Sequence, residues 1–142
     1  MDISRAELLA LLRTEPHWVV ATVGPDGRPA SAVVGVAVAD DLTLVFDTLA
    51  TTRKCQNLRA DSRVALTMWH GERTVQLEGL ADEPTGDALT SLRDLYLATF
   101  PAGAERLAWP GITHVRVHPT WVRWSDFSGA EPRVGEVLPP YG

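Results

Sequence analysis

FDTLATTRKCQNLRADSRVALTMWHGERTVQLEG, residues 46–79, contains the sharpest change of pattern in the chain. Its first residues end a strand of alternating bulky side chains, and Thr51 or Thr52 can then cap a short helix. Residues 63–70 and 73–81 are rich in β-branched and aromatic residues and flank a glycine turn, which is typical of a hairpin. The segment therefore predicts a strand, a helix and two further strands in succession.

The same patterns continue on both sides of this segment. Ser4 and Glu7 form a capping box for a first short helix, which Pro16 stops. Thr85 can cap a longer helix that closes at Phe100. The strand-like segments number seven in all, and they lie at residues 17–23, 29–38, 42–47, 63–70, 73–81, 112–118 and 121–127.

The order of these elements predicts a mainly β fold. The strands follow one another without crossover helices long enough for parallel pairing, so about seven strands and three helices indicate an antiparallel barrel or sandwich. Gly79 within a strand predicts a bulge or a close approach of another backbone. We expect one domain at residues 1–127 and an extended tail at residues 128–142, which carry three Pro and three Gly. A barrel this small leaves little interior room, so a cofactor would lie on its outer wall or in a cleft between subunits.

The composition excludes several classes of protein. The 142 residues are 45% hydrophobic and 22% charged, as in an ordinary folded domain. A net charge of −5 argues against a general nucleic-acid binder. The single cysteine, Cys55, cannot form an internal disulfide or a thiolate zinc cluster. No signal sequence and no apolar run of about 18 residues is visible, so we expect a cytoplasmic protein that does not bind membranes.

Thr51-Thr52-Arg53-Lys54 is the strongest local indication of a binding site. Two hydroxyls, two cations and the free N–H groups of a helix start converge there, which is how proteins hold a phosphate group. The alternative interpretation is a solvated helix start with ordinary surface charges. The tetrapeptide alone does not decide between them.

Other polar residues give weaker indications. His114 and His118 would share one face of a strand at roughly 13 Å, too far apart to chelate one ion, so no metal site is expected. Cys55 has no obvious base or resolving thiol, and we expect no catalytic cysteine. Trp121 and Trp124 in the last strand are typical of core or interface packing.

The segment from Phe46 to Gly79 resembles the flavin-binding split-barrel family typified by pyridoxamine 5′-phosphate oxidase. The resemblance rests on a strand ending in an aromatic residue and Thr, then Ser/Thr-Arg-Lys, a helix with Asn-Leu, Arg-Val, a Trp and an Arg-x-Val…Glu-Gly strand. It extends more weakly over residues 18–38 and 121–127. It implies an antiparallel split β-barrel that binds flavin mononucleotide (FMN) as a homodimer, with the flavin in the subunit interface.

The resemblance also implies positions for the cofactor. The FMN phosphate would lie on Thr52, Arg53 and Lys54, with Asp47 and Thr48 beside the ribityl chain and ring. The strand Ala32–Ala37 would run along the flavin, and the remaining implied contacts are Val33 and Val34 in that strand, Thr74 and Gln76 from the neighbouring subunit, and Trp124 near the ring.

The resemblance further implies hydride transfer at the flavin N5 to or from a small substrate, without a dedicated acid or base. The pyridoxamine oxidases carry an Arg and a Lys at the ends of the strand that here begins and ends with Ala32 and Ala37, so synthesis of pyridoxal phosphate is not expected. Two alternatives stay open: a reductase that uses the deazaflavin coenzyme in the same site, and a non-enzymatic flavin or haem carrier or stress protein.

Overall fold

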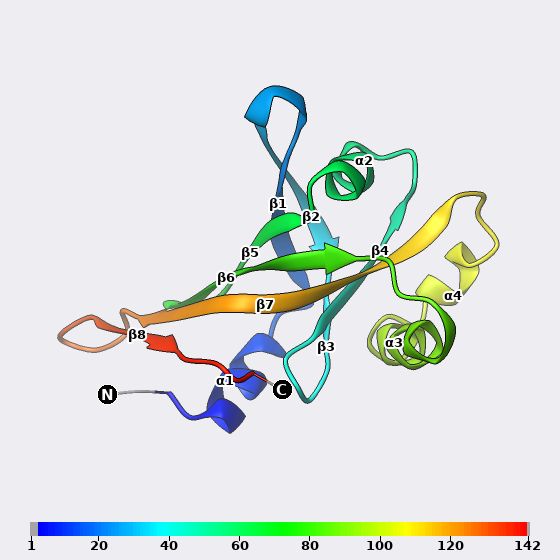
Figure 1. The fold of residues 1–142 in the computed structure, drawn as a ribbon. Helices are drawn as coiled ribbons and strands as arrows, with labels where there is room; N and C mark the ends of the chain where they lie inside the picture. Colours follow the sequence, from blue (N-terminus) through cyan, green and yellow to red (C-terminus); the bar gives the residue numbers. More distant parts are fainter. Residues whose placement is uncertain (1–2, 142) are drawn as a thin grey trace.

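The computed structural model describes residues 3–141, in which eight strands form one curled antiparallel sheet with four α-helices and a 3₁₀ turn around it (Figure 1). The strands are β1 (His17–Val23), β2 (Pro29–Gly35), β3 (Ala37–Val38), β4 (Leu44–Leu49), β5 (Arg63–His70), β6 (Arg73–Asp82), β7 (Ile112–Asp126) and β8 (Arg133–Val137). The helical elements are α1 (Arg5–Leu12), η1 (Pro25–Gly27), α2 (Arg53–Ala60), α3 (Gly86–Thr99) and α4 (Gly103–Arg106).

The strand order explains how the sheet closes. It runs β2-β1-β5-β6-β7-β4-β3, and β8 pairs with β7. The two outermost strands of that order, β2 and β3, are separated in the chain by Val36 alone, so the sheet curls back on itself. Trp18, Phe46, Leu66 and Met68 are fully buried inside the curl. The predicted antiparallel split barrel is thereby confirmed.

The long strand β7 replaces two predicted strands. Residues 112–118 and 121–127 are predicted as two strands, and between them lies Pro119, which lacks the N–H that a central strand needs. In the structure β4 pairs with β7 only as far as Val117, and β8 begins pairing at Val122. Pro119 falls between these two partners, and on the other edge of β7 it pairs with Gly79 at the bulge of β6, so β7 continues through it. The prediction of a single strand at residues 29–38 is also corrected, since it is divided into β2 and β3.

The C-terminal segment is not the simple extended tail that its Pro and Gly content predicts. Residues 133–137 form β8, and Tyr141 lies 9% exposed in the main core. Gly135 allows this pairing, because a Cβ at that position would lie 2.8 Å from the indole nitrogen of Trp124. Residues beyond 127 therefore contribute to the barrel.

Local signals for turns and caps are largely reproduced. The Ser4–Glu7 capping box is present, with the Glu7 amide donating to Ser4 Oγ at 3.1 Å. The predicted bulge at Gly79 is confirmed: the register of β6 shifts there, and a Cβ would lie 2.5 Å from the His118 carbonyl oxygen. Thr85 precedes α3 as expected, but its side chain makes no capping hydrogen bond.

Within residues 3–141, no helix combines the length and the apolar character that crossing a membrane would require.

Candidate functional site

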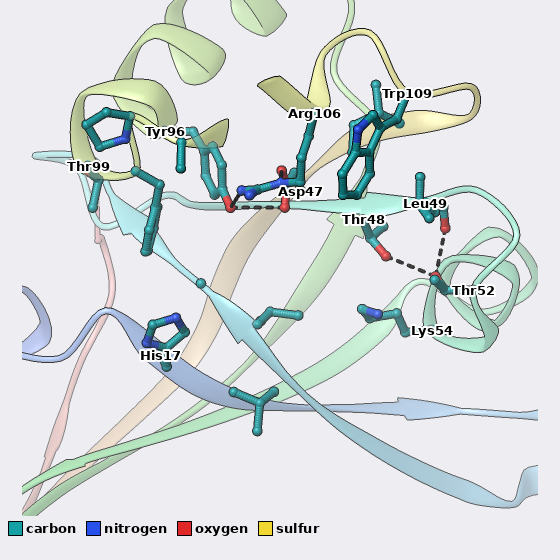
Figure 2. Close-up of a pocket in the computed structure, with 17 residues that line it drawn as sticks. His17, Asp47, Thr48, Leu49, Thr52, Lys54, Tyr96, Thr99, Arg106 and Trp109 are labelled. Carbon is teal, nitrogen blue, oxygen red and sulfur yellow. Dashed lines mark hydrogen bonds and ion pairs between the residues drawn. The ribbon is translucent and has the colours of Figure 1, made fainter. Parts of the chain in front are cut away.

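A pocket of about 510 Å³ lies beside the end of β4 and the start of α2, and it extends between β2 and the α3–α4 segment (Figure 2). Thr52 and Lys54 lie at one end of the pocket, and His17 and Thr99 lie at the other. Gly35 brings α3 close to the sheet, since a Cβ there would come within 2.8 Å of the Phe100 ring. The pocket has the size typical of small-molecule sites.

The two threonines at the α2 end bond mainly to the protein itself. Thr52 Oγ1 donates to the Leu49 carbonyl at 2.7 Å and accepts from the Cys55 amide at 3.4 Å, so Thr52 rather than Thr51 is the N-cap. Thr48 Oγ1 lies 2.9 Å from Thr52 Oγ1. Because the single Thr52 proton already points to Leu49, Thr48 is the donor in this pair. Neither hydroxyl keeps a free proton for a ligand.

The first turn of α2 supplies donors instead. Among residues 3–141, the backbone N–H groups of Arg53 and Lys54 have no acceptor, and neither side chain makes an ion pair or a hydrogen bond. Free N–H groups at a helix start carry partial positive charge and attract anions. Lys54 lines the pocket, so this end of it is suited to an anionic group.

A network of three polar side chains forms another wall of the pocket. Asp47 on β4 accepts from Tyr96 Oη of α3 at 3.0 Å and from Arg106 Nε of α4 at 2.7 Å. Arg106 Nη2 also donates to Tyr96 Oη at 3.1 Å. Both carboxylate oxygens of Asp47 are thus engaged, and the network joins three elements that are far apart in the sequence.

Burial sets the protonation of the groups around this network. The pKa of Tyr96 is raised to about 12, first by desolvation and then by the charge of Asp47. Burial lowers the pKa of His114, whose ring lies 5.5 Å from that of Tyr96 in an edge-on arrangement. Tyr96 is therefore a neutral phenol at physiological pH and acts as a hydrogen-bond donor.

The structure brings together most, but not all, of the residues predicted to contact the cofactor. Six of them line the pocket: Val33, Val34, Asp47, Thr48, Thr52 and Lys54. Arg53 lines two neighbouring pockets rather than this one. Thr74 and Gln76 alternate with the buried Val75 and Leu77, so they lie on the outer face of β6 and not in this pocket.

Trp124 lies elsewhere, in the core. It is 2% exposed, and its Nε1 is the one buried side-chain nitrogen or oxygen without a partner in residues 3–141. Arg133 of the neighbouring strand β8 stacks 5.5 Å from its ring centroid. The indole packs inside the barrel, as the core interpretation predicts, and the structure offers no ring face of Trp124 to the pocket.

Several lining residues had no signal in the sequence. Tyr96 lies in the helix predicted between Thr85 and Phe100, and Arg106 and Trp109 lie between that helix and the strand predicted at residues 112–118, where no element is predicted. In the structure, Gly103 lets α4 approach Tyr96, because a Cβ at that position would lie 3.1 Å from the Tyr96 ring. A metal site has no support in the part of the chain described, since no group of three potential ligands converges there.

The fold and the pocket together define a class, an antiparallel split barrel in which unpaired donors at a helix start lie beside a pocket. Residues 4–123 match the sequence model of the pyridoxamine 5′-phosphate oxidase family. A pyridoxine/pyridoxamine 5′-phosphate oxidase of Rubrobacter xylanophilus is 38% identical over 98 residues, which cover 67% of this chain and 43% of the relative. The chain belongs to the pyridoxamine 5′-phosphate oxidase family.

Solved structures share the fold at lower identity. A haem binding protein from Mycobacterium smegmatis superimposes with a TM-score of 0.84 at 20% identity, covering 97% of this chain and 59% of that one. A protein from Mesorhizobium loti described as FAD-binding gives a TM-score of 0.71 at 20% identity and covers 86% and 92% of the two chains. The matched segment spans less than half the length of the curated relatives, 43% and 48% in two of them.

Proposed function

We propose that this protein binds FMN noncovalently, with the phosphate at the start of α2. The observation that carries this proposal is the set of unpaired donors there, namely the Lys54 side chain and the backbone N–H groups of Arg53 and Lys54. An anion is the natural partner of such a set, because charge-assisted hydrogen bonds are the strong ones. Thr52 contributes by capping the helix that presents these donors.

The rest of the pocket fits a flat, largely apolar ring. Val33 and Val34 line the side formed by β2, and Phe100 and Trp109 add aromatic surface on the side of α3 and α4. Arg106 Nη1, which no described residue uses, is available as a donor to a ligand, and Thr48 Oγ1 is available as an acceptor only. When bound, the flavin would supply hydride-transfer chemistry at its N5 atom.

The residues of the pocket favour binding and orientation over acid–base catalysis. Asp47 is engaged by two donors, and the raised pKa of Tyr96 keeps its phenol protonated. We therefore assign no dedicated acid or base and propose a flavin-dependent oxidoreductase that acts on a small, unidentified substrate. A cytoplasmic location stays a prediction of the sequence.

A homodimer would explain why apolar side chains are exposed on the outer face of the sheet. Val33 is 67% exposed and Trp69 is 54% exposed, and Thr74 pairs directly with Trp69 in the register of β5 and β6. Apolar side chains exposed in this way are typical of a surface that another subunit covers. We propose that Thr74 and Gln76 reach the flavin of the partner subunit across this face.

A non-enzymatic carrier is the second candidate. It is supported by Asp47, the one carboxylate in the lining described for residues 3–141, which two donors already hold, and by the likeness to a haem binding protein. The deazaflavin coenzyme is the alternative cofactor, since its phosphate could use the same donors. Reduction kinetics and cofactor titration separate these possibilities.

The experiment has two stages. The absorption spectrum of the purified protein is recorded, and the apo form is titrated with FMN, haem and deazaflavin coenzyme; the proposal expects flavin bands and saturable FMN binding. Replacing both cations, Arg53→Ala and Lys54→Ala, should weaken FMN binding by at least tenfold. Unchanged affinity would show that the phosphate lies elsewhere. Stopped-flow mixing with NADH or NADPH then tests catalysis, and a bound flavin that neither donor reduces would favour the carrier.

A further inference from the structure

The chain between β6 and β7 contains a helical segment bounded by two glycines. Gly86 begins α3 with a φ of +61°, and Gly111 directly precedes β7 with a φ of +80°. Glycine adopts such angles without strain, whereas other residues rarely do. A Cβ at Gly86 would meet nothing within 4 Å, and one at Gly111 would make only ordinary contact with Ala50 at 3.8 Å. The direction of the backbone, rather than close packing, therefore requires glycine at both positions.

The two ends of residues 86–111 are held differently. The Gly111 carbonyl accepts from the backbone amide of Ala50 at 2.7 Å, which ties this end to the residue that follows β4. At the other end, Thr85 precedes α3 without a side-chain capping bond. Residues at the ends of elements absorb the changes of backbone angle when a segment moves, and small residues are common there. Gly86 and Gly111 have the positions and the conformational freedom of two hinges.

The segment packs through a small apolar cluster that is separate from the main core. This cluster consists of Leu92, Leu95, Tyr96, Leu97 and Phe100, packed against Ala37 of β3 and Val45 of β4. Within residues 3–141, no member of the main core comes from residues 86–111. Moving the segment would expose the small cluster and leave the main core intact. Local openings of this kind cost less free energy than unfolding of the whole domain.

The polar bonds that hold the segment converge on one carboxylate. In the described part of the chain, the side-chain hydrogen bonds from residues 86–110 to the barrel both end on Asp47, from Tyr96 at 3.0 Å and from Arg106 at 2.7 Å. Tyr96 belongs to α3 and Arg106 belongs to α4, so a single residue of β4 holds both helices. Loss of these two bonds would leave only apolar contacts between the hinges.

The same segment covers the main pocket. Seven of the 17 residues that line the pocket lie between positions 96 and 109. Figure 2 shows Tyr96, Arg106 and Trp109 across the pocket from His17 and Lys54. Phe100 reaches the opposite wall, where its ring lies 6.1 Å from that of His17. Displacement of the segment would therefore remove one wall of the pocket and open it to solvent.

We propose that residues 86–111 form a lid that opens as one unit about Gly86 and Gly111, with the bonds of Tyr96 and Arg106 to Asp47 as its latch. A ligand enters and leaves the pocket when the latch is broken, and the closed lid excludes water from the pocket. The inference concerns access to the pocket and does not depend on which ligand the pocket binds.

The test measures how often the surface beneath the lid becomes accessible in the apo protein. Val45→Cys places a thiol under the lid, and Val75→Cys places one in the main core; both valines are fully buried strand residues. Each variant also carries Cys55→Ala, so that one thiol is present. The reaction of this thiol with an aromatic disulfide reagent is followed by absorbance at increasing urea concentrations below the unfolding transition.

We expect the Val45→Cys thiol to react at least about tenfold faster than the Val75→Cys thiol without urea. Its rate should change little with urea, because opening the lid exposes little surface, whereas the rate of Val75→Cys should rise steeply. The two substitutions remove the same atoms from fully buried strands, so a difference in side-chain size does not explain a difference in rate.

Two further substitutions test the latch in the Val45→Cys background. Arg106→Gln should raise the labelling rate at least about fivefold, since it removes a bond to a charged group. Tyr96→Phe keeps the ring in the small cluster, removes the other bond to Asp47 and should also raise the rate. Arg63→Gln is the matched control: its ion pair with Asp61 lies outside the lid and is 71% exposed on the arginine side, so the rate should change less than about twofold.

Two results would overturn the proposal. If the thiols of Val45→Cys and Val75→Cys react at the same rate with the same dependence on urea, residues 86–111 open only when the domain unfolds, and there is no lid. If the lid opens but neither Arg106→Gln nor Tyr96→Phe accelerates labelling, Asp47 is not its latch. The proposed function stands in both cases, because these measurements use no cofactor.

Discussion

Replacing Arg106 by alanine tests whether the network on Asp47 holds the α3–α4 segment against the barrel. Arg106 donates at 2.7 Å to Asp47 and at 3.1 Å to Tyr96, and all three residues line the pocket. The Asp47 side chain is only 13% exposed, so water replaces little of the lost pairing. The substitution leaves a mostly buried carboxylate with Tyr96 as its remaining donor.

The magnitude follows from the bonds that are lost. Hydrogen bonds to charged groups contribute about 1.5–3 kcal/mol, and the Arg106 side chain is 28% exposed, so we expect a loss of about 2 kcal/mol in the free energy of unfolding. For a domain of this size this corresponds to a decrease of roughly 4–8 °C in Tm. The affinity for the cofactor should also decrease, because the α3–α4 wall of the pocket is held less firmly in place.

The assay is urea unfolding of the apo protein, with Arg63→Ala as the control. Arg63 also pairs with a carboxylate, that of Asp61, but its side chain is 71% exposed, and such pairs contribute about 0–1 kcal/mol. A cycle with Asp47→Ala should reveal a coupling energy of at least about 1 kcal/mol. If Arg106→Ala costs no more than Arg63→Ala, the network does not stabilise the wall and the reasoning is refuted.

Three further predictions concern single residues. Thr52→Ala should cost about 1 kcal/mol in urea unfolding through loss of the α2 cap, and Thr52→Ser should restore it. Gly79→Ala should strongly reduce Tm, since the new Cβ would meet the His118 carbonyl at 2.5 Å; an unchanged Tm would contradict the bulge geometry. The Tyr96 pKa is raised from 10 to about 12, so its contribution is complete below pH 10 and lost as the pH rises toward 12. Tyr96→Phe should flatten the decline of stability in that range, and an identical decline would place the effect in other groups.

Much of the fold was predictable because its signals are local. The Ser4–Glu7 box, the cap at the start of α2 and the bulge at Gly79 each depend on a few neighbouring residues. The strand β8 was missed for the same reason: the Gly and Pro content of residues 128–142 is typical of a tail, whereas the pairing of β8 with β7 depends on Gly135 fitting over Trp124. Local sequence patterns do not predict a contact between residues that are distant in the chain.

The candidate site shows the same division. The run from Thr48 to Lys54 is local, and the structure places Thr48, Thr52 and Lys54 in one pocket. Tyr96 and Arg106 bond to Asp47 from 49 and 59 residues away in the sequence, and no periodicity of the sequence predicts these contacts. Arg53 lines a separate pocket beside β2, and this placement likewise depends on how α2 packs against the sheet.

The central claim is that the start of α2 holds a phosphate, and comparing FMN with riboflavin tests it most directly. The two ligands share the ring and the ribityl chain and differ in the phosphate alone. We predict that the apo protein binds FMN at least tenfold more tightly than riboflavin and that Lys54→Gln removes most of this difference while leaving riboflavin affinity within twofold. Equal affinity for the two ligands in the unsubstituted protein would contradict the account.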